Sequence, residues 1–184
     1  NRPHWDYHNR SLGKELAQWF HDNAIAPPFL HLPFYEQTGR GQLRWLSALA
    51  DNEHDRERAI DEIKRALEFT DIQPVAHVVA HLGIPNQQFS PLLFEYAYSL
   101  MRHISEFSGV TILIENSRNE VATMKRIPEF LTLAQLPEIR ICYDTGHRRL
   151  EEPLPSLDGV SAIHLSDNDG SGVDHLWPFE GGVN

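Results

Sequence analysis

The clearest strand in the sequence is Val110-Thr111-Ile112-Leu113-Ile114, and a carboxylate, Glu115, follows it directly. Such an apolar run, rich in β-branched residues, predicts a strand that is buried on both faces. Similar short runs occupy residues 29–32, 75–81, 139–143 and 160–163. Because helical patterns separate most of these runs, we expect crossover units and a parallel sheet.

Four helices are expected between the strands. Ser11 is the predicted cap of a helix whose apolar residues are Leu12, Leu16, Trp19 and Phe20. A second helix contains Ile60, Ile63 and Leu67, and a third runs from Ser90-Pro91 through Phe107 to Gly109. A fourth covers residues 121–135, with a kink expected at Pro128. Residues 36–53 predict a long polar connection, and residues 153–155 a Pro-rich link.

Length and composition predict a single domain over residues 1–184. The chain is 41% hydrophobic, which suffices for one substantial core. Its net charge of −10 disfavours a nucleic acid partner, and its apolar runs are too short to span a membrane. Cys142 is the only cysteine and Asn1 to Arg10 lacks the pattern of a signal peptide, so we expect a reducing, cytoplasmic setting.

Ionisable residues stand at the carboxyl end of every predicted strand: His31, His81, Glu115, Asp144 and His164. One such residue is most often the first solvated position, but five of them meet at the same edge of a parallel sheet, where ligands bind. Carboxylates combined with imidazoles suit Zn²⁺, Mn²⁺, Co²⁺ or Fe²⁺, whereas oxygen ligands alone favour Mg²⁺ or Ca²⁺. The pattern therefore predicts a site for a divalent metal ion.

Three neighbouring segments are less decisive. Gly146 permits a turn that returns His147 toward the same opening. Asp167, Asn168 and Asp169 are typical of turn chemistry, and His175 beside Asp174 is equally compatible with a surface pair. Trp5, Trp19 and Trp45 are interpreted as packing or loop anchors, and Trp177 is an open candidate for substrate contact.

The ordered motifs resemble the xylose isomerase-like barrels, and within them the sugar phosphate isomerase/epimerase group, which is related to endonuclease IV. The resemblance rests on Glu115-Asn116, Tyr143-Asp144-Thr145-Gly146-His147, and the segments 164–170 and 174–178. It implies an α/β fold, the eight-stranded (β/α) TIM barrel. The five strands then correspond to strands 3–7, with strands 1, 2 and 8 absent. We therefore expect residues 1–184 to be a fragment of one barrel domain.

The resemblance also implies roles for the site residues. Glu115, Asp144 and His164 would bind one divalent ion (Mn, Co, Zn or Mg), together with a glutamate from the absent eighth strand. Glu115 and His147 would be catalytic, and His31, His81, His147 and His175 would bind the substrate. The expected partner is a small carbohydrate, with no nucleic acid or membrane, and a homo-oligomer is compatible with the resemblance.

Two other classes stay open. An endonuclease IV-like phosphodiesterase would use several zinc ions and extra histidines, for which His31, His81, His147 and His175 are available. Against it, Val173 stands where that class has an aspartate two residues before the loop histidine. A non-catalytic relative of the barrel is the third class, although two buried carboxylates without a cation would cost stability.

Overall fold

The computed structural model describes residues 6–37, 41–106, 110–171 and 175–183. Its main sheet has five strands, which are β1 (Phe29–His31), β4 (His77–His81), β5 (Thr111–Glu115), β6 (Arg140–Asp144) and β7 (Val160–His164). All of them pair in parallel, in the order β1-β4-β5-β6-β7. The predicted parallel sheet is therefore confirmed, with each strand within two residues of its expected place.

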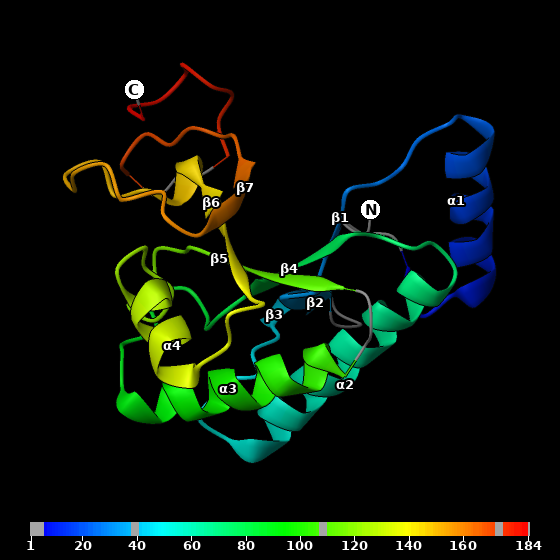
Figure 1. Ribbon diagram of the computed structural model, residues 1–184, viewed down its shortest axis with the longest axis horizontal. Helices are drawn as coiled ribbons and strands as arrows, with labels where there is room; N and C mark the ends of the chain where they lie inside the picture. The colour runs from blue at the N-terminus through cyan, green and yellow to red at the C-terminus, as the bar shows by residue number, and fades with distance from the viewer. Residues whose placement is uncertain (1–5, 38–40, 107–109, 172–174, 184) are drawn as a thin grey trace.

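Three helices cover one face of this sheet, as Figure 1 shows: α2 (Glu53–Leu67), α3 (Pro91–Ser105) and α4 (Arg126–Ala134). Their buried side chains pack with outward-facing strand residues such as Val78, Ile112 and Ile141 in the main hydrophobic core. Ser90 precedes α3 and Pro91 begins it, as expected, whereas Phe107 and Gly109 lie outside the described residues. None of the helices in the described part of the chain is long and apolar enough to cross a membrane.

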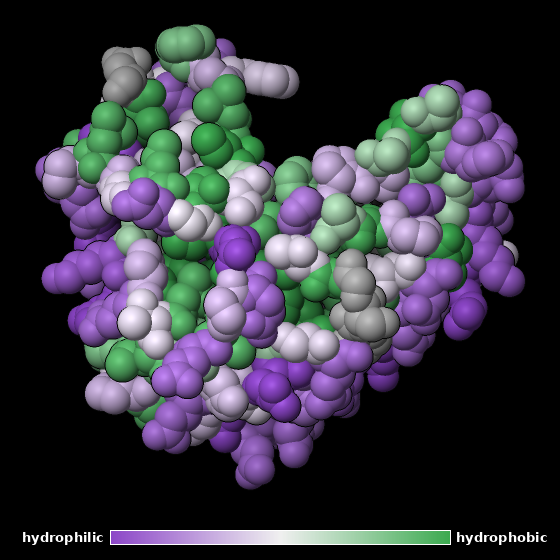
Figure 2. All heavy atoms as spheres, in the orientation of Figure 1, coloured by the Kyte–Doolittle hydropathy of each residue, from purple (hydrophilic) through white to green (hydrophobic). Residues whose placement is uncertain are grey.

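The opposite face of the sheet is concave, and none of the helices among the described residues covers it, so the strands form a curled half-barrel (Figure 1). A second, small cluster lies on this inner face and consists of Val79, Leu113, Cys142 and Ala162, with Phe29 beside it. Figure 2 shows the outline of the molecule hollowed between the part that carries β7 and the part that carries α1. This arrangement is an incomplete (β/α) barrel, as the fold prediction stated.

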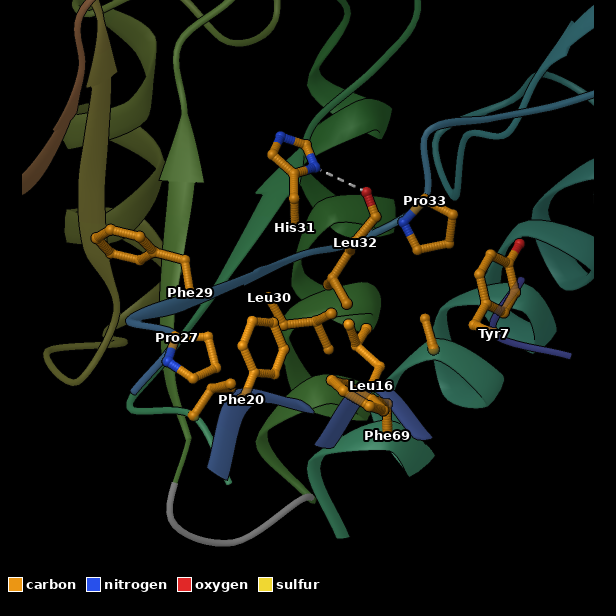
Figure 3. Close-up of a pocket in the computed structure, with 12 residues that line it drawn as sticks. Tyr7, Leu16, Phe20, Pro27, Phe29, Leu30, His31, Leu32, Pro33 and Phe69 are labelled. Atoms are coloured by element: carbon orange, nitrogen blue, oxygen red, sulfur yellow. Dashed lines mark hydrogen bonds between the residues drawn. The ribbon is translucent and has the colours of Figure 1, made fainter. Parts of the chain in front are cut away.

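The first helix differs from its prediction at the cap. Helix α1 (Arg10–Asp22) is capped by Asn9, whose side-chain oxygen accepts a hydrogen bond from Leu12 N at 3.1 Å, and Ser11 lies inside the helix. Leu16 and Phe20 face an apolar cavity of about 240 Å³ between α1 and β1 (Figure 3). Leu12 and Trp19 remain exposed, so only half of the predicted apolar face is used.

Two further predictions were wrong in detail. Residues 36–53 are not a plain connection, because β2 (Tyr35–Gln37) and β3 (Leu43–Trp45) form an antiparallel hairpin and α2 begins at Glu53. Helix α4 begins at Arg126 rather than near 121, so Pro128 lies in its first turn, where a missing N–H causes no kink. Residues 121–122 instead donate their backbone N–H groups to the Asn119 side chain.

The connection between β6 and β7 has no α-helix. The 3₁₀ turn η2 (Thr145–His147) follows β6, and the Pro-rich segment then leads to β7, as the sequence predicted. In consequence, Ile163 on the outer face of β7 is 53% exposed.

Candidate metal centre

The ends of the five parallel strands meet at the concave side of the sheet. Strand register places His81 opposite Glu115 and Asp144 opposite His164. Each terminal residue follows an inner-face residue by two positions, as Glu115 follows Leu113, so their side chains project to the same side. They line one cavity of about 780 Å³ together with His147 and His175. All seven predicted site residues are thus in one place.

Glu115 lies at the centre of the cluster and is only 1% exposed. Its Oε2 atom is 3.1 Å from His31 Nε2 and 3.2 Å from His81 Nε2. Its Oε1 atom is 3.2 Å from His164 Nδ1 and 3.5 Å from His147 Nδ1. One carboxylate therefore has four imidazole neighbours drawn from four different segments of the chain.

These contacts set the charge states of the cluster. Burial favours a raised pKa for Glu115, but hydrogen bonds with His164, His31 and His81 outweigh it and hold the pKa far below its usual range. Hydrogen bonds with Cys142 and Glu115 raise the pKa of His164 to about 10. Burial lowers the pKa of His81, which favours its neutral form. A neutral imidazole is the form that binds metal ions.

Asp144 is oriented by its surroundings so that one oxygen faces the cavity. Its Oδ1 atom accepts hydrogen bonds from Gly146 N at 2.7 Å and from Ser166 Oγ at 2.8 Å. Its Oδ2 atom lies 3.7 Å from His175 Nδ1, 3.8 Å from His147 Nδ1 and 4.0 Å from His164 Nδ1. Oδ2 is therefore the oxygen available to a ligand.

Backbone carbonyl groups orient two of the imidazoles. His31 Nδ1 donates to Leu32 O at 3.0 Å (Figure 3), and His147 Nδ1 donates to Asn116 O at 2.8 Å. Because a carbonyl oxygen can only accept, Nδ1 carries a proton in both rings. In neutral His147 this leaves the lone pair on Nε2, whereas His31 Nε2 faces the Glu115 carboxylate at 3.1 Å and donates to it. Ligand histidines in metal proteins are commonly held in this way by a hydrogen bond from the other ring nitrogen.

Three groups of side chains in the described part of the chain have ligand atoms close enough together to hold a metal ion. They are His31–His81–Glu115, Glu115–Cys142–His164 and Asp144–His147–His175. Glu115 belongs to two of them, and Asp144 approaches His164 at 4.0 Å. Nitrogen and carboxylate oxygen ligands in this mixture suit Zn²⁺, Mn²⁺ or Co²⁺. The donor set therefore fits the predicted metal ion.

His175 reaches the cluster through a loop that Asp167 organises. The Asp167 carboxylate is 1% exposed and accepts hydrogen bonds from the backbone N–H groups of residues 168, 179, 181 and 183, at 2.8–3.0 Å. Its backbone pairs in both directions with Leu176 at 2.9 Å, directly beside His175. The sequence assigned Asp167 to simple turn chemistry and missed this role, because its partners lie up to 16 residues away.

The roles of other side chains at or behind the site also went unrecognised. Asn116 binds both backbone groups of Asp144, with its Oδ1 2.6 Å from Asp144 N and its Nδ2 3.0 Å from Asp144 O. Phe34 and Trp45 line the cavity from the hairpin side, although the sequence analysis interpreted Trp45 as a packing or loop anchor. The position of Asn116 directly after Glu115 was a sequence signal that could have identified Asn116. The sequence held no such signal for Phe34 and Trp45.

Some expected contributors lie elsewhere. Trp177 is 78% exposed and is not among the residues that line the cavity. Asp169 accepts hydrogen bonds from Ser171 N and Ser171 Oγ, both at 2.8 Å, which is the turn role that the sequence predicted. Val173 and Asp174, which bear on the phosphodiesterase alternative, lie outside the described residues, and so does Trp5.

The chain is similar to proteins of one family. A profile of the family described as Xylose isomerase-like TIM barrel matches residues 2–184. An uncharacterized protein from Sinorhizobium fredii is 25% identical over 170 residues, which are 82% of this chain and 51% of that protein. The chain thus spans about half the length of that relative.

Two solved structures share the architecture. A D-tagatose 3-epimerase-like protein has a TM-score of 0.72 and 20% identity, over 96% of this chain and 69% of that chain. Endonuclease IV from Thermus thermophilus has a TM-score of 0.65 and 18% identity, over 96% of this chain and 68% of that chain. At such identities the likeness shows the fold alone.

Proposed function

Since the chain belongs to the xylose isomerase-like TIM barrel family, we propose that it carries the active site of a metal-dependent isomerase or epimerase of sugars or sugar phosphates. Glu115, Asp144 and His164 would hold one divalent ion. The epimerase-like neighbour in the same fold agrees with this assignment. The observation that carries the proposal is a pair of buried carboxylates facing a common cavity among imidazoles.

A bound cation would add to the compensation that imidazole groups already give this pair. Glu115 and Asp144 are 1% and 2% exposed, and burying charge without compensation is costly. Among the described residues that line the cavity, Arg118 is the only lysine or arginine, and the ionisable groups close to both carboxylates are histidines. A divalent ion bound between Glu115, Asp144 and His164 would supply further positive charge and would polarise a substrate carbonyl group.

The side chains around the ion would handle the proton. A polarised carbonyl acidifies the neighbouring C–H group, and the Glu115 carboxylate beside the ion would remove that proton. His147 would contact a substrate oxygen, because its Nε2 is left for the cavity while Nδ1 donates to Asn116 O. His31, His81 and His175 would line the substrate's path and keep the carboxylates oriented.

Deuterium exchange tests the proposal at the step that defines it. Metal-loaded full-length protein in ²H₂O should incorporate deuterium at the carbon beside the carbonyl of a ketose substrate, observed by ¹H NMR. Glu115→Gln should slow this exchange by about 10²–10⁴-fold, the usual contribution of a positioned acid-base group. Glu129→Gln, on the exposed side of α4, is the matched control. Unchanged exchange in Glu115→Gln would refute the assigned base.

A second candidate is phosphodiester hydrolysis, and one observation favours it. Three separate groups, His31–His81–Glu115, Glu115–Cys142–His164 and Asp144–His147–His175, each have ligand atoms close enough together to hold an ion. Several ions are what an endonuclease IV-like phosphodiesterase would require, and endonuclease IV shares the fold. The net charge of −10 weighs against a polyanionic substrate.

Metal stoichiometry separates the two candidates. One equivalent of Mn, Co or Zn per chain, lost in Asp144→Asn, would support the isomerase, whereas three zinc ions with hydrolysis of bis(p-nitrophenyl) phosphate would support the phosphodiesterase. Elemental analysis by plasma mass spectrometry gives the count. Full-length protein that binds no metal ion tightly would refute both.

A further inference from the structure

The hairpin places two aromatic rings in a row that ends at the metal cluster. Phe34 and Trp45 stack with their ring centroids 6.0 Å apart and their planes at 23°. Phe34 also stacks on His81, at 4.5 Å and 22°. His81 in turn lies 3.2 Å from Glu115, so the row links the hairpin to the central carboxylate.

Trp45 is the outer ring of this row and is 43% exposed, whereas its neighbour Leu46 is 4% exposed. Strand pairing explains the difference, because Trp45 is the cross-strand partner of Tyr35 and Leu46 N is bonded to Phe34 O at 2.9 Å. The hairpin thus holds a large ring at the rim of the cavity. The ring stays partly exposed there, although removing its apolar surface from water would be favourable. A large aromatic side chain that lines a cavity and is held by neighbouring rings is suited to contact a ligand.

The rest of the cavity narrows the class of that ligand. Asn86 and Arg118 also line it and offer hydrogen bonds, so the site combines an apolar wall with a few polar groups. A sugar ring has the matching character, with a C–H face that is attracted to the negative face of an aromatic ring and hydroxyl groups at its edge. A nucleic acid would need more cations than Arg118, since Glu115 and Asp144 face the same space.

We propose that Trp45, held by Phe34, is the aromatic platform against which the ring of a carbohydrate substrate packs, at the rim of the cavity that Glu115 and Asp144 also line. This inference rests on the proposed function and names the part of the site that selects the substrate. It assigns the hairpin β2–β3 to recognition and the strand ends to chemistry.

Ligand titration of the metal-loaded full-length protein tests the platform. Binding of D-fructose and D-tagatose is measured by calorimetry for the wild type and for Trp45→Ala, Trp45→Phe and Trp19→Ala. Trp45→Ala should weaken binding about tenfold, Trp45→Phe should keep most of the affinity, and Trp19→Ala, an exposed tryptophan on α1, should bind normally. Metal content, measured in parallel, should be equal in all four proteins.

Two results would overturn the inference. One is unchanged ketose affinity in Trp45→Ala, and the other is a wild-type protein that binds neither ketose but binds oligo(dT) in a Trp45-dependent manner. Failure of the proposed function would give another result. Ketose binding would still depend on Trp45, but deuterium exchange or tight metal binding would be missing. Conversely, exchange that persists without any effect of Trp45→Ala would refute the platform and leave the isomerase intact.

Discussion

Two segments flank the metal cluster, and they are held in different ways. The hairpin β2–β3 is fixed by many small contacts: ring stacking of Phe34 and Trp45, strand pairing, and ion pairs of Glu36 with Arg44 and Arg58. The Asp167 loop, of which residues 166–171 and 175–183 are described, is fixed there chiefly by one carboxylate that accepts four backbone N–H groups.

This difference has a cause in the sequence. The hairpin has aromatic and charged side chains that can contact one another, whereas the Asp167 loop is rich in glycine and short polar residues. A loop of that composition has few apolar contacts, so its backbone donors need an acceptor from within the fold. Many residues stabilise the hairpin, whereas one residue stabilises most of the Asp167 loop. The hairpin and the loop should therefore respond differently to single substitutions.

The largest effect is expected for Asp167→Asn. An amide has one oxygen acceptor where the carboxylate has two, so the donors now bound to the other oxygen face an NH₂ group that cannot accept. The loop should open locally, and chymotrypsin should cleave after Phe179 at least about ten times faster than in the wild type, as mass spectrometry would show. Cleavage within the hairpin should not change.

Asp169→Asn is the matched control, because Asp169 lies in the same loop, is exposed, and accepts short-range hydrogen bonds from Ser171. Its cleavage rate should stay close to that of the wild type. Equal protection of Asp167→Asn and Asp169→Asn would contradict the idea that one carboxylate holds the loop.

An intermediate effect is expected from pH on the Tm of metal-free protein. It originates at His164, which belongs to neither the hairpin nor the Asp167 loop. The pKa of His164 is raised from 6.5 to about 10 by its hydrogen bonds with Cys142 and Glu115. Its proton therefore stabilises the metal-free fold fully below about pH 6.5, and this contribution is lost as pH rises toward 10. The Tm of metal-free protein should fall over that window in the wild type and in Asp167→Asn alike. His164→Asn should remove the slope, and a slope that survives this change would assign it to another group.

The smallest effect is expected for Glu36→Gln in the hairpin. Glu36 pairs with Arg44 and Arg58 near the surface, where an ion pair is worth less than about 1 kcal/mol. The free energy of unfolding in urea should decrease by no more than that, and ketose affinity should be unchanged. A loss as large as that caused by Asp167→Asn would show that the hairpin too depends on a single residue.

The parts of the fold that could be predicted are those with local signals. The apolar run that ends at Glu115 and its four counterparts predicted the strands, and Ser90-Pro91 predicted the start of α3. The hairpin could not be predicted, because Tyr35–Gln37 and Leu43–Trp45 are strands of three residues without an apolar run. The cap of α1 was misplaced because serine and asparagine both cap well. What decides between Asn9 and Ser11 is the residue at which the backbone changes from extended to helical, and this is Asn9.

The same division applies to the site. Residues at strand ends could be placed together from the sequence because parallel strands share an edge, and their roles as ligands stay predictions. Asp167 was not recognised because its partners come from a distant segment, and Trp45 because cross-strand pairing alone turns it toward the cavity. Contacts that depend on tertiary closure leave no periodic pattern in the sequence.

The turn after Asp144 has a consequence for how such sequences can diverge. A Cβ atom on Gly146 would lie 2.1 Å from Ser166 Oγ, the hydroxyl that donates to Asp144 Oδ1. A side chain at 146 therefore requires the Ser166 hydroxyl to move or a smaller residue at 166, and the carboxylate then loses a hydrogen bond. Among homologues, a residue other than glycine at 146 should occur together with a change at 166, so a substitution at 146 should mark lineages in which the carboxylate is no longer under selection.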